Sequence, residues 1–337
     1  MFPRLRFWHW FAFGSPTGGG ADYGVVEVSV SGGPWQAVSP QYYYSGGDWT
    51  YASVDFSAFA GQSVQIAFHL VGQSYSSAPG WYFDNIVFES GMPVLNNPEG
   101  WENGIGDWYP DQGIWQVGTP TKSAGAPTNS LGAQAESGTN CAATLLNANY
   151  PAYPNSDSRL ISPPFILPTI SSSPFLRFWH WYSLGPATGG APDQASVEIR
   201  VGTNNWQTIS PIYTGNSGSW SEPFIDLSPF AGESVQLAFH VYARSYSSGK
   251  GWYVDNVQVY PYTYSAYPPY LLISQSGTNT VATWTWLANY TGFGLQSNTD
   301  LLSTNWNPVS SIQAVVNGLN TVTNPVFETK EFYRLIK

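Results

Sequence analysis

The chain has 337 residues, enough for two or three domains. Only 9% of the residues are charged and 17% are aromatic, with 34 Gly and 26 Pro, which is typical of secreted all-β proteins. The net charge of −10 disfavours nucleic acid and anionic membranes as partners, and no apolar run reaches the roughly 18 residues of a membrane span. We therefore expect an extracellular or cell-surface protein that neither binds nucleic acid nor inserts into a membrane.

The first predicted strand contains the motif RFWHW at residues 6–10. Strand alternation directs two sets of side chains to opposite faces: Leu5, Phe7 and His9 on one, and Arg6, Trp8 and Trp10 on the other. Residues 64–70 form a second alternating strand, with Gln65, Ala67 and His69 on its less apolar face. If the apolar sets face the core, the remaining sets lie side by side on one sheet, and this sheet presents the tryptophans.

The whole region recurs after a shift of 171 positions, without insertion. RFWHW recurs at residues 177–181, FAGQSVQIAFH at 59–69 returns as FAGESVQLAFH, and GWYFDN at 80–85 returns as GWYVDN. The chain therefore contains two copies of one domain. Short alternating strands separated by Gly, Pro, Ser and Asn clusters predict tandem jelly-roll β-sandwiches.

The two copies are not equally complete. About 75 residues, from Trp101 to Pro174, precede the second copy, whereas four residues precede Leu5. We predict an incomplete jelly roll over 1–90 that lacks its N-terminal strands, a complete one over 97–261, and a small immunoglobulin- or fibronectin-like sandwich over 268–337. Either the gene starts upstream of Met1, or Met1 opens a truncated domain whose missing strands come from elsewhere. Open edges of such a domain invite self-association by β-strand addition.

The ordered motifs LRFWHW, DLSPFAG, SVQLAFH and GWYVDN, with the entry strand RLISPPF at 159–165, support a family comparison. Together they resemble the MAM-like jelly-roll accessory domains of secreted bacterial proteins, including those attached to immune-inhibitor-A-type metalloproteases. This resemblance implies a non-catalytic module for adhesion, substrate targeting or carbohydrate binding. The C-terminal unit resembles the small spacer or sorting repeat that closes many secreted bacterial proteins.

A tryptophan-bearing sheet suits a polysaccharide or cell-surface glycan, because sugar C–H faces stack on indoles while amide and cationic groups bond the hydroxyls. The predicted ligand-binding residues are Trp8, Trp10, His69, Arg177, Trp179, Trp181, Gln236 and His240. The alternative is that the loop at 14–22 folds over this face and buries it.

A structural calcium site is the second prediction. In the related jelly rolls an acidic residue near each end of the domain binds calcium, and Glu102 and Asp255 match those positions, while Asp193 adds a further oxygen. The alternative is that Asp255 caps a turn by accepting backbone N–H groups.

Catalysis has little support, because the sequence contains neither H-E-x-x-H nor G-x-S-x-G. His180, His240 and Glu198 resemble three metal ligands if they share a sheet, but strand histidines more commonly bond to neighbouring side chains. Cys141, the only cysteine, is expected to be a buried small hydrophobe. We therefore predict a binding protein and not an enzyme. The alternatives are a surface or matrix protein assembling through β-edges, or the accessory region of a secreted hydrolase whose catalytic domain lies outside this chain.

Overall fold

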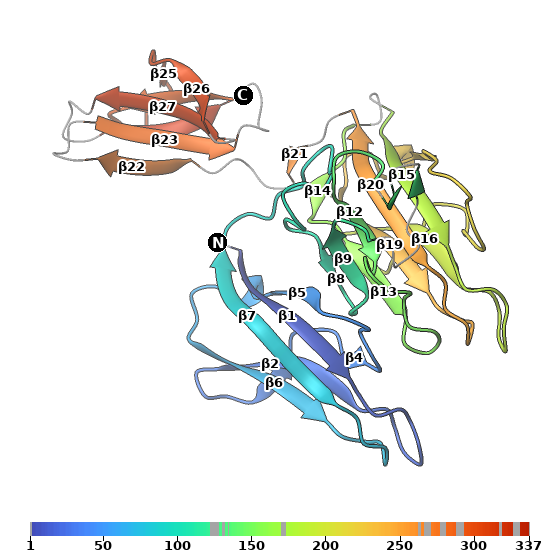
Figure 1. Cartoon of the computed structure of the whole chain (residues 1–337). Coiled ribbons are helices and arrows are strands. Elements are labelled where there is room, and N and C mark those ends of the chain that lie inside the picture. The colour runs from blue at the N-terminus through green and yellow to red at the C-terminus, as the bar shows by residue number, and fades with distance from the viewer. Residues whose placement is uncertain are drawn as a thin grey trace. The chain divides into compact units, whose positions relative to one another are not determined.

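The computed structural model describes residues 2–121, 128–129, 132–133, 135–169, 173–261, 264–265, 271–276, 281–287, 293–316, 319–325 and 331–336. These residues form β-strands joined by turns and short 3₁₀ segments, so the prediction of an all-β fold is confirmed (Figure 1). The chain divides into two compact units, Met1–Ser265 and Ala266–Lys337. No helix among the described residues is long and apolar enough to cross a membrane.

The first repeat (residues 3–90) is a sandwich of two antiparallel sheets. One sheet has the order β5-β1-β7, and in the other β2 is flanked by β3, β4 and β6. Alternation along β1 buries Leu5, Phe7 and His9 against the opposite sheet. The ring of Phe7 lies 5.1 Å from that of Phe68, which belongs to the opposite sheet. The elements are β1 (Pro3–Ala12), β2 (Tyr23–Val30), β3 (Trp35–Ala37), β4 (Tyr42–Tyr43), β5 (Thr50–Asp55), the 3₁₀ turn η1 (Ser57–Phe59), β6 (Val64–Val71) and β7 (Gly80–Ser90).

The second repeat (residues 175–260) has the same strand order at its centre, but its sheets are wider. They read β18-β15-β20-β12-β9 and β17-β16-β19-β13-β8, with β14 also paired to β19. The repeat itself contributes β15 (Phe175–Ser183), β16 (Gln194–Val201), β17 (Gln207–Thr208), β18 (Phe224–Asp226), the 3₁₀ turn η4 (Ser228–Phe230), β19 (Ser234–Tyr242) and β20 (Gly251–Tyr260).

The additional strands come from residues 91–174, which we call the connecting segment. It adds β9 and β12 beside β20, and β8, β13 and β14 beside β19. Its indoles Trp101, Trp108 and Trp115 are fully buried in the core of the second repeat. The strands are β8 (Tyr109–Pro110), β9 (Trp115–Gly118), β10 (Thr128–Asn129), β11 (Gly132–Ala133), β12 (Cys141–Thr144), β13 (Asp157–Ile161) and β14 (Phe165–Ile166), and β14 also pairs with β21 (Tyr264–Ser265).

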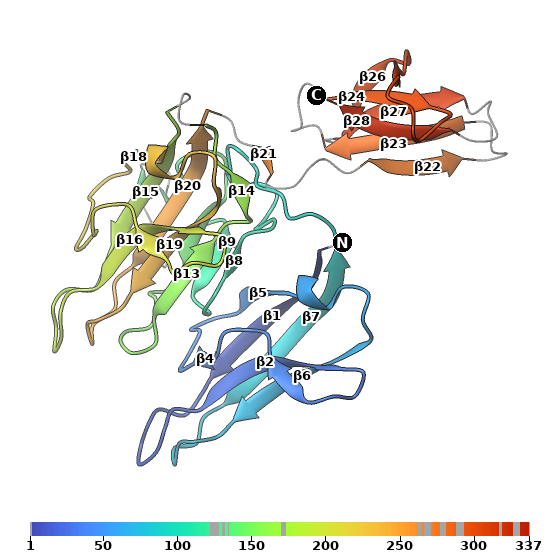
Figure 2. The ribbon, with the colours of Figure 1, turned by 180° about the vertical axis from the view of Figure 1, so that it is seen from behind.

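The first repeat contacts the connecting segment through its β4–β5 side (Figure 2). Gln112 Nε2 donates to the backbone carbonyl of Gln41 at 2.7 Å, and Gln116 Nε2 donates to that of Trp49 at 3.0 Å. At one end of β1, Arg4 also donates to Asp107 of the connecting segment at 2.7 Å, and Glu89 of β7 pairs with Arg6 there. Among the described residues, the free edges of β6 and β7 form no strand pairing with the connecting segment.

The C-terminal unit is a small two-sheet structure with strand orders β22-β23-β27-β26 and β25-β24-β28. Trp284 and Trp286 lie on the same face of β23, and both are buried. The Trp284 ring lies 4.2 Å from that of Tyr333 in the other sheet. The strands are β22 (Leu272–Ser276), β23 (Val281–Leu287), β24 (Gly294–Asn298), β25 (Asn307–Pro308), β26 (Gln313–Val316), β27 (Leu319–Pro325) and β28 (Phe332–Ile336).

Candidate functional site

The structure does not bring the predicted ligand-binding residues together on one face. β1 and β6 lie in opposite sheets with their apolar faces towards each other, so Trp8 and Trp10 point away from His69. In the second repeat, Trp179 and Trp181 on β15 are likewise separated from Gln236 and His240 on β19. The alternation along each strand was predicted correctly, but the shared sheet was wrong, because the two strands form the two walls of one core.

The aromatic face of the first repeat is partly open. Trp8 and Trp10 are half-buried and pack edge to face on Tyr51 and Tyr82, each with ring centroids 5.5 Å apart. The Arg6 guanidinium lies 4.5 Å from the centre of the Tyr51 ring. The loop at 14–22 does not cover these indoles, because it bonds to residues 73–76 instead.

The equivalent face of the second repeat is more closed. Trp181 is only 6% exposed, because Ala135, Cys141 and Tyr253 pack against it. Trp179 is half-buried, and the exposed Arg177 pairs with Glu222 at 3.1 Å. Cys141 is fully buried as predicted, and burial raises the pKa of its thiol.

The three carboxylates predicted to bind calcium do not form a common ligand set. Glu102 accepts hydrogen bonds from the backbone N–H groups of residues 139 and 140, and Asp255 accepts those of 137 and 256. Asp193 lies elsewhere, where it accepts bonds from Tyr150 Oη and the N–H groups of 244 and 245. Within the described ranges, no group of three His, Cys, Asp or Glu side chains is arranged to hold a metal ion. Calcium binding stays a prediction, which melting curves with calcium and with a chelator check.

Two of the four histidines belong to the core. His9 Nδ1 accepts a hydrogen bond from Trp81 Nε1 at 3.3 Å, and His180 Nδ1 accepts the equivalent bond from Trp252 at 3.2 Å. Burial lowers the pKa of His9 to about 3 and that of His180 to about 4, so both rings are neutral. The idea that His180 shares a sheet with His240 and Glu198 is wrong, because β15 lies in one sheet and β16 and β19 lie in the other.

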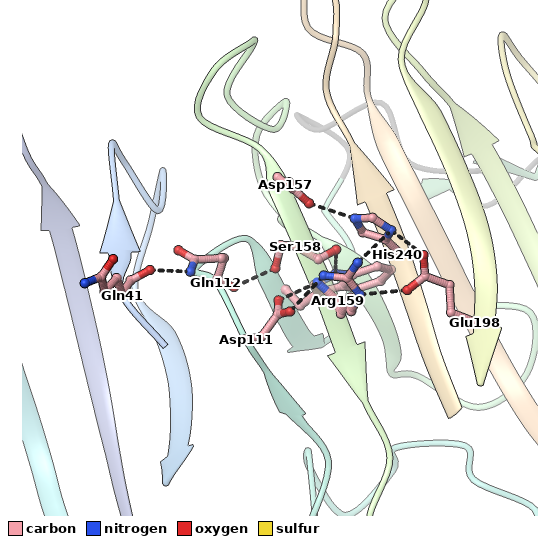
Figure 3. Close-up of polar contacts among 9 residues, drawn as sticks. Gln41, Asp111, Gln112, Asp157, Ser158, Arg159, Glu198 and His240 are labelled. Atoms are coloured by element: carbon pink, nitrogen blue, oxygen red, sulfur yellow. Dashed lines mark hydrogen bonds and ion pairs between the residues drawn. The ribbon is translucent and has the colours of Figure 1, made fainter. Parts of the chain in front are cut away.

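His240 is instead part of a charged cluster on the outer face of β16, β19 and β13 (Figure 3). Its Nδ1 lies 2.8 Å from Glu198 Oε1, and its Nε2 lies 2.7 Å from Asp157 Oδ1. Arg159, opposite His240 on β13, donates to Glu198 at 2.7 Å and to Asp111 at 3.3 Å. We call these five residues, Asp111, Asp157, Arg159, Glu198 and His240, the charged cluster.

Burial and mutual pairing set the charge states of this cluster. Burial would lower the pKa of His240, but its hydrogen bonds to Asp157 and Glu198 outweigh that effect and raise it. Burial would raise the pKa of Glu198, but His240 and Arg159 lower it. At Asp111 burial prevails over Arg159, and the pKa is raised. At all three groups, burial and pairing therefore shift the pKa in opposite directions.

A cavity of about 230 Å³ opens beside the cluster, between the first repeat and the connecting segment. We call it the junction pocket. Two aromatic side chains from the first repeat face amide and charged groups from the connecting segment. The lining residues are Tyr43, Tyr44, Asp111, Gln112, Pro154, Asn155, Asp157 and Arg159.

Tyr44 adopts an unfavourable backbone conformation in this pocket. Its φ is 62°, in the left-handed region that residues other than Gly rarely occupy. The equivalent residue of the second repeat is Gly215, with φ 70°. The first repeat therefore keeps a tyrosine where the second repeat has glycine, and strained backbone of this kind is enriched at functional sites.

His240 and Glu198 of the charged cluster were identified from the sequence, whereas Asp111, Asp157 and Arg159, which also line the junction pocket, were not. Gln236 bonds Arg200 at 2.6 Å beside the cluster, whereas Asp111, Asp157 and Arg159 come from the connecting segment, which has no second copy to compare. Two signals were available in the sequence: the charges at 157 and 159 share one strand face in a chain with few charges, and Tyr44 aligns with Gly215.

Comparison with known proteins gives partial likenesses. No family model matches the chain. It is 32% identical over 124 residues to bacillopeptidase F of Bacillus subtilis (strain 168), which is 36% of this chain but only 8% of that protein. The matched region is thus a small part of a much longer protein.

Several solved structures resemble part of the chain at low scores. They include TmCBM61 in complex with β-1,4-galactotriose (16% identity, TM-score 0.34, 50% of this chain and 99% of that one). A non-crystalline-cellulose-specific carbohydrate-binding module, CBM28, matches at 18% identity and TM-score 0.30, over 50% of this chain and 95% of that one. The K3 cleaved adhesin domain of Lys-gingipain from Porphyromonas gingivalis W83 matches at 16% identity and TM-score 0.29. This match covers 49% of this chain and 98% of that one. These scores assign no ligand to the chain.

Proposed function

We propose that this chain is an extracellular, non-catalytic glycan-binding module of the MAM-like type, and that the junction pocket holds one sugar residue of a polysaccharide or cell-surface glycan. The observation that carries the proposal is the pairing of Tyr43 and Tyr44 with the planar polar groups of Asp111, Asn155 and Arg159 around one cavity. Aromatic rings suit the C–H face of a sugar, and carboxylate, amide and guanidinium groups suit its hydroxyls.

The size and rigidity of the pocket favour a small, polar ligand. At about 230 Å³ it lies below the usual range for drug-sized ligands, so it is suited to a single ring. Arg159 is held by Asp111 and Glu198 before any ligand arrives. Because these groups are already ordered, little conformational entropy is lost on binding.

Binding of the full chain to insoluble polysaccharides, followed by calorimetry with soluble oligosaccharides, tests the proposal. Tyr44→Gly removes the ring in a backbone conformation that Gly accepts, and we expect it to weaken binding about 2- to 10-fold, the value of one aromatic contact. Tyr75→Ala is the matched control, because Tyr75 is 86% exposed and does not line the pocket. Retention on no glycan, or equal binding by the Tyr44→Gly variant, would reject the pocket as a sugar site.

The stacking role predicted for Trp8 and Trp10 is tested in the same assay. Both rings are half-buried on a face separate from the junction pocket. If Trp8→Ala and Trp10→Ala abolish retention while Tyr44→Gly does not, the aromatic face of the first repeat is the binding site.

A second candidate function is the accessory region of a larger enzyme. The match to 8% of the length of bacillopeptidase F favours it, because it relates this chain to one part of a long protein named as a peptidase. The intact mass of the native gene product is the test: a product of 36.9 kDa with no attached domain would reject this candidate.

A further inference from the structure

In the part of the chain that the structure describes, the first repeat leaves two strand edges unpaired on the same side of its sandwich. In the second repeat β19 pairs with β16 and also with β13 and β14, and β20 pairs with β15 and with β12. Within the described residues, β6 pairs only with β2, and β7 pairs only with β1. Both edges lie away from the β4–β5 side that contacts the connecting segment (Figure 1).

The interior of the first repeat is also open between these two edges. Leu70, Ile86 and Phe88 are 51%, 52% and 51% exposed. Their equivalents in the second repeat, Val241, Val257 and Val259, are 0%, 3% and 2% exposed. These positions are apolar in both repeats, so the difference arises from what covers them. An apolar surface of this kind, bordered by unpaired strands, is typical of an interaction site.

The second repeat shows what kind of group fits this space. There the connecting segment places the Trp108 ring 6.1 Å from Phe239 and the Trp115 ring 6.0 Å from Trp252. Phe239 and Trp252 recur in the first repeat as Phe68 and Trp81, which remain half-buried. The first repeat therefore retains the surface that receives these indoles.

We infer that the open side of the first repeat binds an extended, tryptophan-bearing polypeptide segment with the chemistry of the connecting segment, by β-strand addition to β6 and β7. Strand edges select a peptide backbone, because antiparallel pairing satisfies their N–H and C=O groups. The space between the sheets selects bulky apolar side chains.

A second copy of the chain satisfies these requirements less well. Its connecting segment is already buried in its own second repeat. Edge-to-edge pairing of two β7 strands would satisfy one edge and leave the space around Phe68 and Trp81 uncovered. The occupant is therefore a separate segment that brings its own tryptophans.

A variant of the full chain that is lengthened at its N-terminus tests this inference. A second copy of residues 93–173 is placed directly before Pro3, which is equivalent to Pro174, so the junction has the same register as in the second repeat. We expect amide hydrogen exchange in β6 and β7 to slow about tenfold or more, because these strands become internal. The matched control carries Trp101→Ser, Trp108→Ser and Trp115→Ser in the added copy only, and it should protect β6 and β7 much less.

Two outcomes would overturn the inference. Unchanged exchange in β6 and β7, or equal protection by the control, would show that the open side does not accept this segment. Light scattering of the unmodified chain is the second arm: concentration-dependent association with protection of β6 and β7 would assign this side to a second copy instead. Neither readout depends on glycan binding.

Discussion

His69 in the first repeat and His240 in the second are equivalent residues, and each bonds the equivalent glutamate. His69 Nδ1 lies 3.1 Å from Glu27, and the pair is 50% and 21% exposed. His240 Nδ1 lies 2.8 Å from Glu198, and that pair is 14% and 9% exposed. The difference comes from β13 of the connecting segment, whose Arg159 covers and joins the second pair. Adding strands has turned a surface ion pair into a buried network.

The core histidines show the opposite relationship. His9 and His180 accept the same bond from Trp81 and Trp252 whether or not the connecting segment is present. Contacts made within a repeat therefore survive in both copies, whereas burial and charge at the β6 or β19 side depend on the added strands. This contrast makes the repeats matched controls for each other.

The largest expected difference between the repeats concerns the equivalent core tryptophans. Trp252 is fully buried, so Trp252→Ala should destabilise by about 4 kcal/mol. Trp81 is half-buried, and Trp81→Ala should cost about 2 kcal/mol or less. Hydrogen exchange followed strand by strand measures both losses in the full chain. Equal losses would mean that the interior of the first repeat is covered in solution.

The paired glutamates give the next effect. Glu198→Ala leaves Arg159 and His240 without their shared partner and should cost about 2 kcal/mol. Glu27→Ala breaks an exposed pair and should change stability by less than about 1 kcal/mol. Urea unfolding of the two variants measures both losses of stability and compares them. If both substitutions were neutral, the network around Arg159 would contribute nothing to stability.

The pH dependence of stability separates the two kinds of histidine. His180 has a folded pKa of about 4, below its unfolded value, so its contribution is present above about pH 6.5 and is lost as pH falls towards 4. The pKa of His240 is raised, so its contribution is present below about pH 6.5 and is lost as pH rises through the folded value. Unfolding free energies of the wild type, His180→Gln and His240→Gln against pH measure both slopes. A His240→Gln difference that grows above pH 6.5 would contradict the assignment.

Much of the fold could be predicted because the sequence contains two copies of one domain. The repeat and the alternation along residues 5–10 identified the all-β class and the buried faces of the strands. Sheet membership could not be deduced, because alternation tells which side chains share a face of one strand but not which strand faces it across the core. Trp8 and His69 were therefore placed together although they lie on opposite outer faces.

The candidate site was less predictable for a physical reason. Its charged groups combine a repeat strand with the connecting segment, and long-range pairings such as Arg159 with His240 leave no local pattern. In the sequence, Asp111 is an ordinary turn residue and Asp157 is an ordinary residue at the start of a strand. Only the fold brings Asp111 to Arg159 and Asp157 to His240. The difference between Tyr44 and Gly215 was visible, yet its meaning depends on the positive φ that both share.

The smallest effect is expected at that backbone position. Gly215→Ala should cost about 1 kcal/mol from backbone strain alone, because a Cβ added at Gly215 meets no atom within 4 Å. Tyr44→Gly relieves the same strain but removes the ring that lies 6.0 Å from Tyr43, so the net change should stay within about 1 kcal/mol. Urea midpoints of the two variants test this. If Tyr44→Gly destabilised the chain as strongly as a core substitution, Tyr44 would be an anchor of the repeat junction, and its strained backbone would be explained by folding instead of ligand binding.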